Sequence, residues 1–342
     1  MISILSFFIS FVLSTLTTPL AIKLGYKLKI LDLPSERKIH LTPIPRTGGI
    51  VFFFVFWVVA ILLLIFRPLL LDSKLLLFIF ISSLIVFFLG LLDDKKPLSP
   101  YLRLFGQIVA GLILIKGGLK IEMIQIPFYG FLHLSLTFQI IGTILWIILI
   151  INIINWLDGL NGLASGIGII TFLAIVYTAL LPWVNTFPAV VLSTIMIGIL
   201  LGFFPFNFFK GSIFMGDSGS NFLGFMIAVV SILGGSKLAT SFLVLGLPIL
   251  DGLWVILKRI QNRKNIFIAD KNHFHHRLLR LGLSQKQTVV FFWLITFTFG
   301  LMVLSASDKT KFFGLVILVL ICLIFFALLD IIESKKCKNS KR

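Results

Sequence analysis

Acidic residues and cysteines are scarce in this chain of 342 residues. Asp and Glu number 13 against 30 Lys and Arg, which gives a formal net charge of +17, and charged residues of both signs make up only 13%. A soluble domain is usually about a quarter charged. The two cysteines, Cys322 in an apolar run and Cys337 in a basic tail, are not expected to form a disulfide. These shortages exclude a disulfide scaffold, a disordered chain and an ordinary cytosolic enzyme.

Apolar residues are abundant instead, at 58% of the chain, and Phe alone occurs 37 times. A soluble fold of this size cannot bury so much apolar surface, so we expect a lipid bilayer to surround most of the chain. The basic excess could in principle serve nucleic acid. Membrane proteins also collect Lys and Arg in cytoplasmic loops. We therefore expect the bilayer, and no nucleic acid, as a partner.

The apolar residues fall into runs long enough to cross a membrane. A spanning helix needs about 20 apolar residues, and in lipid such a run must be helical to satisfy its backbone. The sequence predicts an all-α polytopic membrane protein with one integral-membrane domain over residues 1–342 and a basic cytoplasmic tail at 332–342. The first run is read as a retained span rather than a signal peptide. The eleven predicted spans cover residues 2–22, 49–66, 75–92, 101–117, 138–155, 162–181, 189–205, 220–235, 238–257, 288–306 and 312–331.

Most of the basic residues lie in one set of loops, so the positive-inside rule predicts an outer N-terminus and a cytoplasmic C-terminus. Outer loops are short, except that residues 118–137 are predicted to form a small hairpin. Nearly every unusual polar residue lies in or beside an inner loop. This placement favours a reaction at the cytoplasmic face over transport, which would more often place polar groups near the middle of the bilayer.

Two inner segments are rich in charge. The first inner loop carries Lys38, His40 and Arg46, which suit an anionic head group, although a basic loop that rests on acidic lipid is an equal alternative. The third run ends in Asp93 and Asp94, which can hold Mg²⁺ or accept a proton. Adjacent helical residues point about 100° apart, so the two carboxylates need not share a role. The alternative is an interfacial cap neutralised by the lysines that follow.

Two further segments combine polar side chains with glycine. Asn152, Asn155 and Asp158 recur every three residues and so lie on one side of a helix, and the glycines that follow begin another helix, whose N-terminus favours phosphate. A capped turn is the structural alternative. Asp217 lies between glycines, where it suits a hard cation that keeps its waters or, equally, a helix N-cap.

The largest inner loop contains three histidines followed by arginine. Such a tract can bind zinc, but the neighbouring arginines favour a phosphate or pyrophosphate. A surface cluster is the remaining alternative. The residues concerned are His273, His275, His276, Arg277 and Arg280. Asp251, at the end of the ninth run, has no assigned role.

These five segments, in this order, resemble the polyprenyl-phosphate N-acetylhexosamine-1-phosphate transferases over about residues 20 to 285. The resemblance implies a Mg²⁺-dependent enzyme, with Mn²⁺ as a substitute, in the bacterial inner membrane with its site on the cytoplasmic face. The enzyme would transfer a sugar-1-phosphate from a UDP-N-acetylhexosamine to a polyprenyl phosphate lipid and release UMP. The product would serve the synthesis of lipopolysaccharide, teichoic acid or another cell-wall polymer, and a homodimer is compatible with this interpretation.

The resemblance also implies roles for single residues. Asp93, Asp94, Asp158 and His275 match positions of the family's catalytic groups, with one of the aspartate pair as a base. Asp217 matches the metal ligand. Substrate-binding positions correspond to Lys38, His40, Arg46, Asn152, Asn155, Gly159, Asn161, Asn207, Phe214, His273, His276 and Arg277.

One position departs from the pattern, because the family's Asp-Gly-x-Asp-Gly turn carries Asn161 in place of its second aspartate. An amide keeps hydrogen-bonding capacity but loses the charge. The spacing of the histidines favours the branch that transfers GlcNAc-1-phosphate to undecaprenyl phosphate. Phospho-N-acetylmuramoyl-pentapeptide transfer is the alternative in the same class. A transporter or lipid-linked-sugar flippase is the alternative of another class, and an inactive scaffold gains weight only from Asn161.

Overall fold

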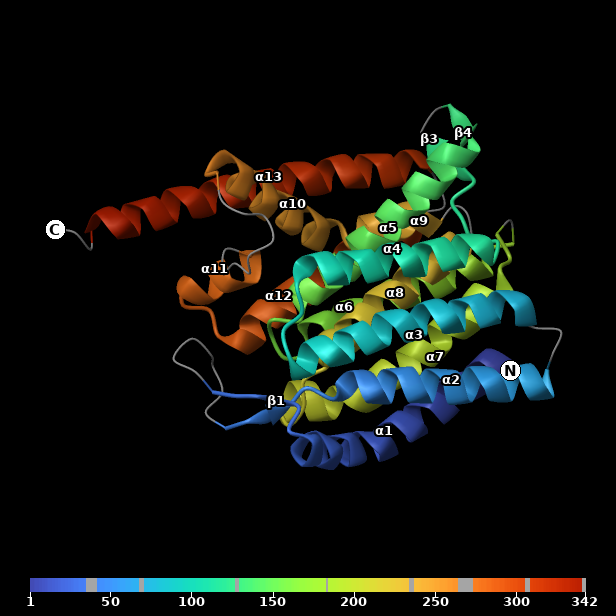
Figure 1. Cartoon of the computed structure of the whole chain (residues 1–342). Coiled ribbons are helices and arrows are strands. Elements are labelled where there is room, and N and C mark those ends of the chain that lie inside the picture. The colour runs from blue at the N-terminus through green and yellow to red at the C-terminus, as the bar shows by residue number, and fades with distance from the viewer. Residues whose placement is uncertain are drawn as a thin grey trace.

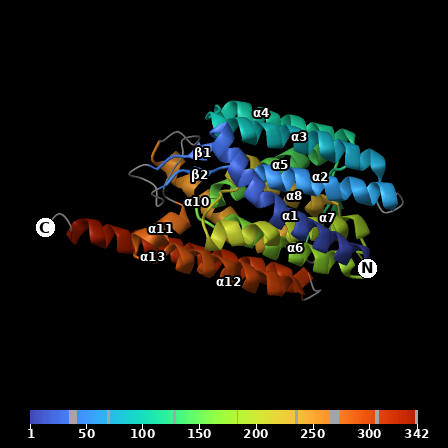
Figure 2. The ribbon, with the colours of Figure 1, turned by 90° about the horizontal axis from the view of Figure 1, so that it is seen from below.

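The computed structural model describes residues 1–34, 42–67, 71–126, 129–182, 184–233, 237–263, 273–304 and 308–339. Within these ranges the chain is almost entirely helical, and the long helices lie side by side in one bundle (Figures 1 and 2). The helices are α1 (Ile2–Leu28), α2 (Gly48–Phe66), α3 (Ser73–Lys95), α4 (Pro100–Lys116), α5 (Leu136–Leu157), α6 (Leu163–Leu180), α7 (Phe187–Phe204), the π-helical turn η1 (Pro205–Phe209), α8 (Gly216–Ile232), α9 (Lys237–Val244), α10 (Gly246–Gln261), α11 (Phe274–Arg280), α12 (Gln285–Leu304) and α13 (Asp308–Asn339).

Two small antiparallel strand pairs mark the ends of the bundle. The predicted hairpin within residues 118–137 is confirmed: β3 (Met123–Ile126) pairs with β4 (Gly130–His133). At the other end, β1 (Leu31–Asp32) pairs with β2 (Ile44–Pro45), a pairing that the sequence did not indicate. α11 lies at the same end of the bundle, and the C-terminal part of α13 extends past it (Figure 1). We call the two ends the hairpin end and the α11 end.

Six of the described helices are long and apolar enough to cross a membrane, namely α1, α2, α3, α5, α6 and α7 with η1. The bent pair α9 and α10 would make a seventh span. The prediction of an all-α polytopic membrane protein is therefore confirmed. The count of eleven spans, and the direction in which the chain crosses the membrane, stay predictions.

The predicted span at 238–257 is wrong in one respect, because it is broken. Residues Leu238–Val244 and Gly246–Gln261 form two helices that meet at an angle of 72°. Pro248 explains the break, since a proline ring inside a helix clashes with the carbonyl four residues earlier, here that of Val244. The break directs α10 toward α11.

The central helix is α8, in which every residue except Asp217 is buried. Its first turn is made of small residues, and these allow α2 and α3 to approach closely. A Cβ added to Gly90 of α3 would lie only 2.5 Å from Cα of Ser218. Gly49 of α2 likewise faces Ser218 and Gly219 without room for a side chain. Small residues in membrane helices permit this kind of close backbone packing, and here the packing brings α3 against the start of α8.

Candidate active site

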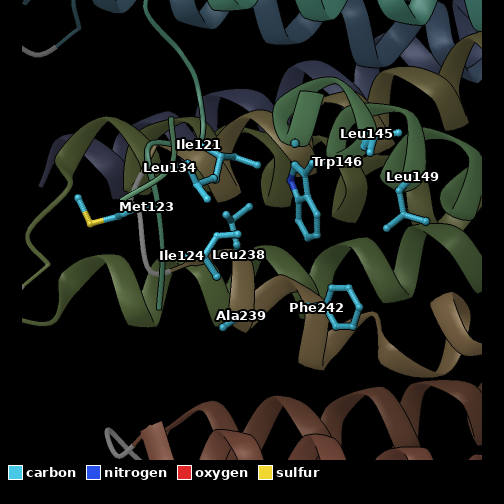
Figure 3. Close-up of a pocket in the computed structure, with 11 residues that line it drawn as sticks. Ile121, Met123, Ile124, Leu134, Leu145, Trp146, Leu149, Leu238, Ala239 and Phe242 are labelled. Carbon is cyan, nitrogen blue, oxygen red and sulfur yellow. The ribbon is translucent and has the colours of Figure 1, made fainter. Parts of the chain in front are cut away.

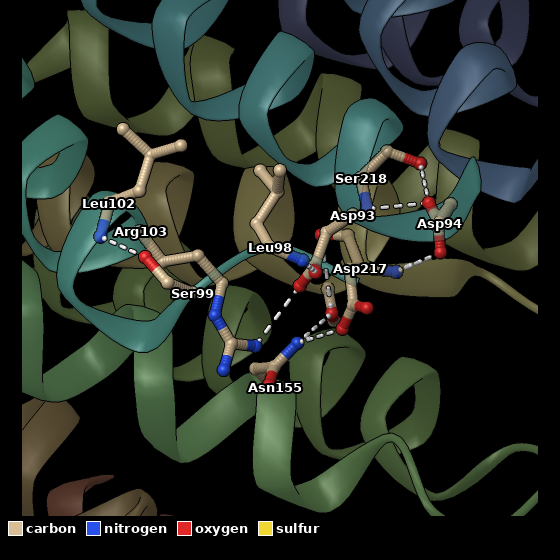
Figure 4. Close-up of polar contacts among 10 residues, drawn as sticks. Asp93, Asp94, Leu98, Ser99, Leu102, Arg103, Asn155, Asp217 and Ser218 are labelled. Atoms are coloured by element: carbon tan, nitrogen blue, oxygen red, sulfur yellow. Dashed lines mark hydrogen bonds and ion pairs between the residues drawn. The ribbon is translucent and has the colours of Figure 1, made fainter. Parts of the chain in front are cut away.

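Asp94 holds the start of α8. Its carboxylate accepts hydrogen bonds from the backbone N–H of Asp217 (2.7 Å), the backbone N–H of Ser218 (2.9 Å) and the Ser218 hydroxyl (2.7 Å), as Figure 4 shows. A carboxylate at this position satisfies donors that have no partner within the helix and meets the positive end of the helix dipole. Asp94 therefore fixes the backbone that presents Asp217.

Asp93 has different partners, as the angle between adjacent helical residues predicted. Its carboxylate accepts the backbone N–H of Leu98 at 2.6 Å and a guanidinium N–H of Arg103 at 3.0 Å (Figure 4). These bonds join the end of α3 to the beginning of α4. The interpretation of the pair as an interfacial cap neutralised by the following lysines is wrong for Asp93, whose cation is Arg103.

Asp217 is bonded across the bundle to α5. The amide of Asn155 donates to its carboxylate at 2.6 Å and to the Ser220 hydroxyl at 3.0 Å. Asn152, one turn earlier on α5, donates to the side-chain carbonyl of Gln107 on α4 at 2.9 Å. The amides that recur every three residues thus connect α5 to two different helices and hold Asp217 in place.

A polar cavity of about 540 Å³ opens beside Asp217 at the α11 end. Residues of the first loop, the turn after α5, the loop before α8 and the histidine segment line it. It contains eight of the residues predicted from the sequence: Arg46, Asn155, Asp158, Gly159, Asn161, Phe214, Asp217 and His276. Segments that are far apart in the sequence therefore converge on one cavity.

In the polar cavity, Arg46 is surrounded by several carboxylates. Arg46 forms an ion pair with Asp32 at 2.9 Å. Burial lowers the pKa of Arg46, but attraction to Asp32, Asp217 and further carboxylates outweighs that cost and raises its pKa overall. Burial, followed by repulsion from Asp217, raises the pKa of Asp158 well above its usual value, with Arg46 opposing. The cavity thus brings together carboxylates that repel each other.

An apolar groove of about 580 Å³ runs between α4, α5 and α10. Most of its surface is apolar, and its polar groups come from Arg103, Gln107, Asn152, Asn155, Arg259, His273 and His276. Asn155 and His276 line both this groove and the polar cavity. The apolar groove therefore meets the polar cavity at two shared side chains.

Asp251, which the sequence left without a role, organises the histidine segment. Its carboxylate contacts Nδ1 of His273 at 3.0 Å and accepts the backbone N–H of Phe274 at 2.8 Å. His273 also lines the apolar groove, so its contact with Asp251 fixes the ring of a groove residue. Asp251 is thus a positioning residue for both His273 and the first turn of α11.

Five of the predicted site residues that the structure describes line neither the polar cavity nor the apolar groove. His275 is buried against Gly159, where an added Cβ would lie 2.8 Å from its Nε2, and neither ring nitrogen has a hydrogen-bond partner. Burial lowers its pKa well below the usual value. Asn207 joins two loops, accepting the N–H of Gly162 and donating to the carbonyl of Ile213. Asp94 is buried and bonded to the backbone of Asp217 and Ser218.

The fourth is Arg277, which pairs with Asp330 of α13 at 2.7 Å. The fifth is Asp93, which is bonded to Leu98 and Arg103. Lys38 and His40 lie outside the described residues. Sequence reasoning missed Asp32, Arg103 and Gln107 as partners of site residues. Gln107 carried a signal, because a lone amide inside an apolar run is costly unless it has a polar partner.

The fold and the site define an integral membrane protein with a carboxylate- and amide-lined cavity at one end of its bundle, joined to an apolar groove. Residues 76–235 match the model of glycosyl transferase family 4. The chain is 32% identical to a probable undecaprenyl-phosphate N-acetylglucosaminyl 1-phosphate transferase of Bacillus subtilis, over 95% of this chain and 90% of the relative.

Two further relatives are similar over most of their length. A decaprenyl-phosphate N-acetylglucosaminephosphotransferase of Mycobacterium leprae is 32% identical over 81% of this chain and 77% of its own. An undecaprenyl-phosphate alpha-N-acetylglucosaminyl 1-phosphate transferase of Haemophilus influenzae is 29% identical over 86% of this chain and 83% of its own. The chain belongs to glycosyl transferase family 4, which confirms the resemblance seen in its five motifs.

Proposed function

We propose that this protein transfers GlcNAc-1-phosphate from UDP-GlcNAc to undecaprenyl phosphate and releases UMP. The observation that carries the proposal is that the polar cavity and the apolar groove share Asn155 and His276. A water-soluble sugar nucleotide and a lipid phosphate need such a meeting place, because one requires a polar site and the other an apolar one. The names of the Bacillus subtilis and Haemophilus influenzae relatives support undecaprenyl phosphate as the acceptor.

The donor set of the polar cavity fits a Mg²⁺ ion, with Mn²⁺ as a substitute. Among the described residues no three His, Cys, Asp or Glu side chains form a complete metal cage. Mg²⁺ usually keeps several waters and binds through one or two carboxylates and the phosphates of its substrate. Asp217 would hold the ion, and the repulsion between Asp217 and Asp158 supports a cation beside them. When bound, the ion supplies positive charge that offsets the repulsion between two phosphates.

In the proposed reaction, an oxygen of the lipid phosphate bonds to the β-phosphorus of UDP-GlcNAc. The bond from that phosphorus to the oxygen shared with the α-phosphate breaks, and UMP leaves with this oxygen. A phosphate monoester has a second pKa near 6 (about pH 6), so the lipid phosphate is largely dianionic at neutral pH and needs little help from a base. The task of the protein is then to position two anions and to balance their charge.

The surrounding residues suit this task. Arg46 lies in the polar cavity with its charge stabilised by Asp32, and His276 stands where the cavity meets the groove. Asn155 orients the Asp217 carboxylate. Asp94 accepts three hydrogen bonds from the start of α8, and this favours a positioning role over proton transfer. Asn161 lines the cavity and can exchange hydrogen bonds with a nucleobase without a charge.

We further propose that the α11 end faces the cytoplasm of a bacterial cell, at the inner membrane. The loops at this end carry most of the basic residues of the chain, which supports the assignment through the positive-inside rule. Sugar nucleotide would then enter the polar cavity from water, and the lipid would enter the groove from the bilayer.

The test uses purified full-length protein in detergent with undecaprenyl phosphate, Mg²⁺ and either UDP-GlcNAc or UDP-MurNAc-pentapeptide, with UMP release as the readout. We expect release with UDP-GlcNAc, loss of release with EDTA, and recovery on addition of Mg²⁺ or Mn²⁺. Release with UDP-MurNAc-pentapeptide alone would replace the proposed sugar. No release with any UDP-sugar would refute the enzyme assignment.

The metal role of Asp217 has its own variant. Asp217→Asn keeps the size of the side chain and removes its charge, so we expect turnover to fall by about 100-fold or more. The matched control is Asp72→Asn, which changes an aspartate at the other end of the bundle that caps α3. Asn is an equally good N-cap, so this control should keep full activity. Unchanged turnover in Asp217→Asn would remove Asp217 from the metal site.

A further inference from the structure

A second apolar cavity lies at the hairpin end, far from the site (Figure 3). It measures about 440 Å³ and lies between the hairpin segment, α5 and α9. We propose that this hairpin cavity receives the distal part of the polyprenyl chain whose phosphate lies at the α11 end. The proposal rests on the proposed function and extends it, because it gives the protein a binding site for chain length as well as for the phosphate.

The hairpin cavity continues the apolar groove. Leu145 and Leu149 of α5 line both of them, so one apolar route runs along α5 from Asn155 to the hairpin end. Thirteen residues separate Asn155 from Gly142, the residue of α5 that lines the cavity nearest the hairpin. At 1.5 Å per residue this part of the route alone is about 20 Å long.

This length distinguishes a polyprenyl chain from a phospholipid of the same leaflet. One leaflet of a bilayer is about 15 Å of hydrocarbon, half of the ~30 Å core. A phospholipid whose head group lies at the α11 end therefore has acyl tails too short to reach the hairpin cavity. A long polyprenyl chain is not limited in this way. The polar groups at the start of the route, Arg103 and Arg259, suit its phosphate.

Gly142 gives independent support for an occupant. Glycine inside a helix costs about 1 kcal/mol relative to alanine and is usually explained by close packing. Gly90 and Gly224 have that explanation, since an added Cβ would meet neighbouring backbone within 3 Å. An added Cβ at Gly142 would meet nothing within 4 Å. The missing side chain leaves open space that lines the cavity, which is what a ligand requires.

The wall of the cavity is also held in place. The Thr143 hydroxyl accepts the backbone N–H of Ile121 at 2.9 Å, which ties the segment before β3 to α5. Trp146 of α5 and Phe242 of α9 lie with their rings stacked, 6.3 Å between centroids. Figure 3 shows Trp146, Ile121 and Leu238 around the same space. A fixed apolar pocket suits a branched hydrocarbon without any polar contact.

The decisive variant is Gly142→Leu, whose side chain would enter the cavity without displacing the protein. The acceptors are undecaprenyl phosphate, which is long enough to reach the cavity, and farnesyl phosphate, which ends within the groove. We expect the KM for undecaprenyl phosphate to rise on the order of tenfold, as expected when about two methylene groups lose their burial. The kcat/KM for farnesyl phosphate should stay unchanged.

The matched control is Ile141→Phe, which adds bulk to the neighbouring residue of α5 on its exposed side. It should leave both acceptors unaffected. Thermal stability gives a second readout that needs no turnover: undecaprenyl phosphate should raise the Tm of the wild type more than farnesyl phosphate does, and Gly142→Leu should remove that difference.

Two results would overturn the inference. Equal losses with both acceptors would mean that Gly142 acts through the fold, and no loss with either would mean that the cavity is not used. In both cases the wild type still turns over its substrates, so the proposed function stands. A wild type that uses neither acceptor, and whose Tm neither lipid raises, would refute the proposed function and this inference together.

Discussion

The two ends of the bundle are constructed in opposite ways. At the α11 end, side chains from α3, α5 and α8 are bonded to each other across long separations in sequence, as in the contact of Asp94 with Ser218. At the hairpin end, the cavity is bounded by apolar side chains, and its residue Gly142 has no neighbour that restricts it. An ionic substrate needs donors and acceptors in fixed directions, whereas a hydrocarbon chain needs volume. The contrast predicts that substitutions at the α11 end act by removing hydrogen bonds, whereas substitutions at the hairpin end act by changing the volume of the cavity.

The largest effect is expected for Asp94→Ala at the α11 end. The change leaves two backbone N–H groups and the Ser218 hydroxyl without their acceptor in a buried place. Unpaired buried donors and a lost helix cap cost about 3 kcal/mol together. We expect a lower Tm in detergent. We also expect reduced turnover, because Asp217 moves with the first turn of α8. Thermal unfolding and UMP release measure the two effects.

Asp94→Asn separates positioning from proton transfer. It keeps one acceptor oxygen but presents an amide to the remaining donors, so the Tm should fall by an intermediate amount and turnover should fall with it. Ser218→Ala, which removes only one of the three contacts, should show a smaller decrease of the same kind. Lost turnover in Asp94→Asn with an unchanged Tm would contradict the positioning role and indicate a base.

The sequence predicted the positions of the helices well and their connections poorly. Hydrophobic runs located most helices to within a few residues, because lipid forces an apolar run to be helical. The break at Val244 carried a signal in Pro248 that the length of the run concealed. The partner of Asp94 carried none, because Ser218 lies 124 residues further along the chain. Spacing within one helix can be read from a sequence, but contacts between helices cannot.

The candidate site shows the same limit. Asp217 and Asn155 were predicted from local patterns, and the structure joins them directly. The resemblance implied a catalytic position for His275 and binding positions for His273 and His276, yet His273 and His276 line a cavity while His275 packs against Gly159. Adjacent residues of one helix face different directions. Which of them faces the ligand depends on the helix that packs against it, here the turn after α5.

Two glycine variants test the contrast, because they are expected to change the stability of the protein in opposite directions. Gly90→Ala places a Cβ 2.5 Å from the α8 backbone at the α11 end, so packing must shift, at a cost of about 1–3 kcal/mol. Gly142→Ala meets no atom and improves helix propensity, so it should stabilise by about 0.5–1 kcal/mol. Thermal unfolding of both variants measures the difference. Destabilisation by Gly142→Ala would mean that the hairpin cavity is more tightly packed than the structure shows.

His275 is expected to make the stability of the protein depend on pH. Burial keeps its pKa well below the usual value, so the folded protein binds fewer protons than the unfolded chain as the pH falls below about 6.5. Stability that is present at neutral pH is therefore lost progressively on acidification, by about 1.4 kcal/mol at pH 5.5 if the buried imidazole stays neutral. His275→Leu removes the titrating group, so its Tm should fall less between pH 7.5 and 5.5 than that of the wild type.

The matched control for this variant is His133→Leu, since His133 is exposed on β4 at the hairpin end. The Tm of this control should fall on acidification by the same amount as that of the wild type. Because the two histidines differ in burial and not in chemistry, a shallower pH dependence in His275→Leu alone would assign the acid sensitivity to the contact between α11 and Gly159. An identical pH dependence in all three proteins would show that His275 becomes protonated without unfolding, and its burial against Gly159 would then have to open to water.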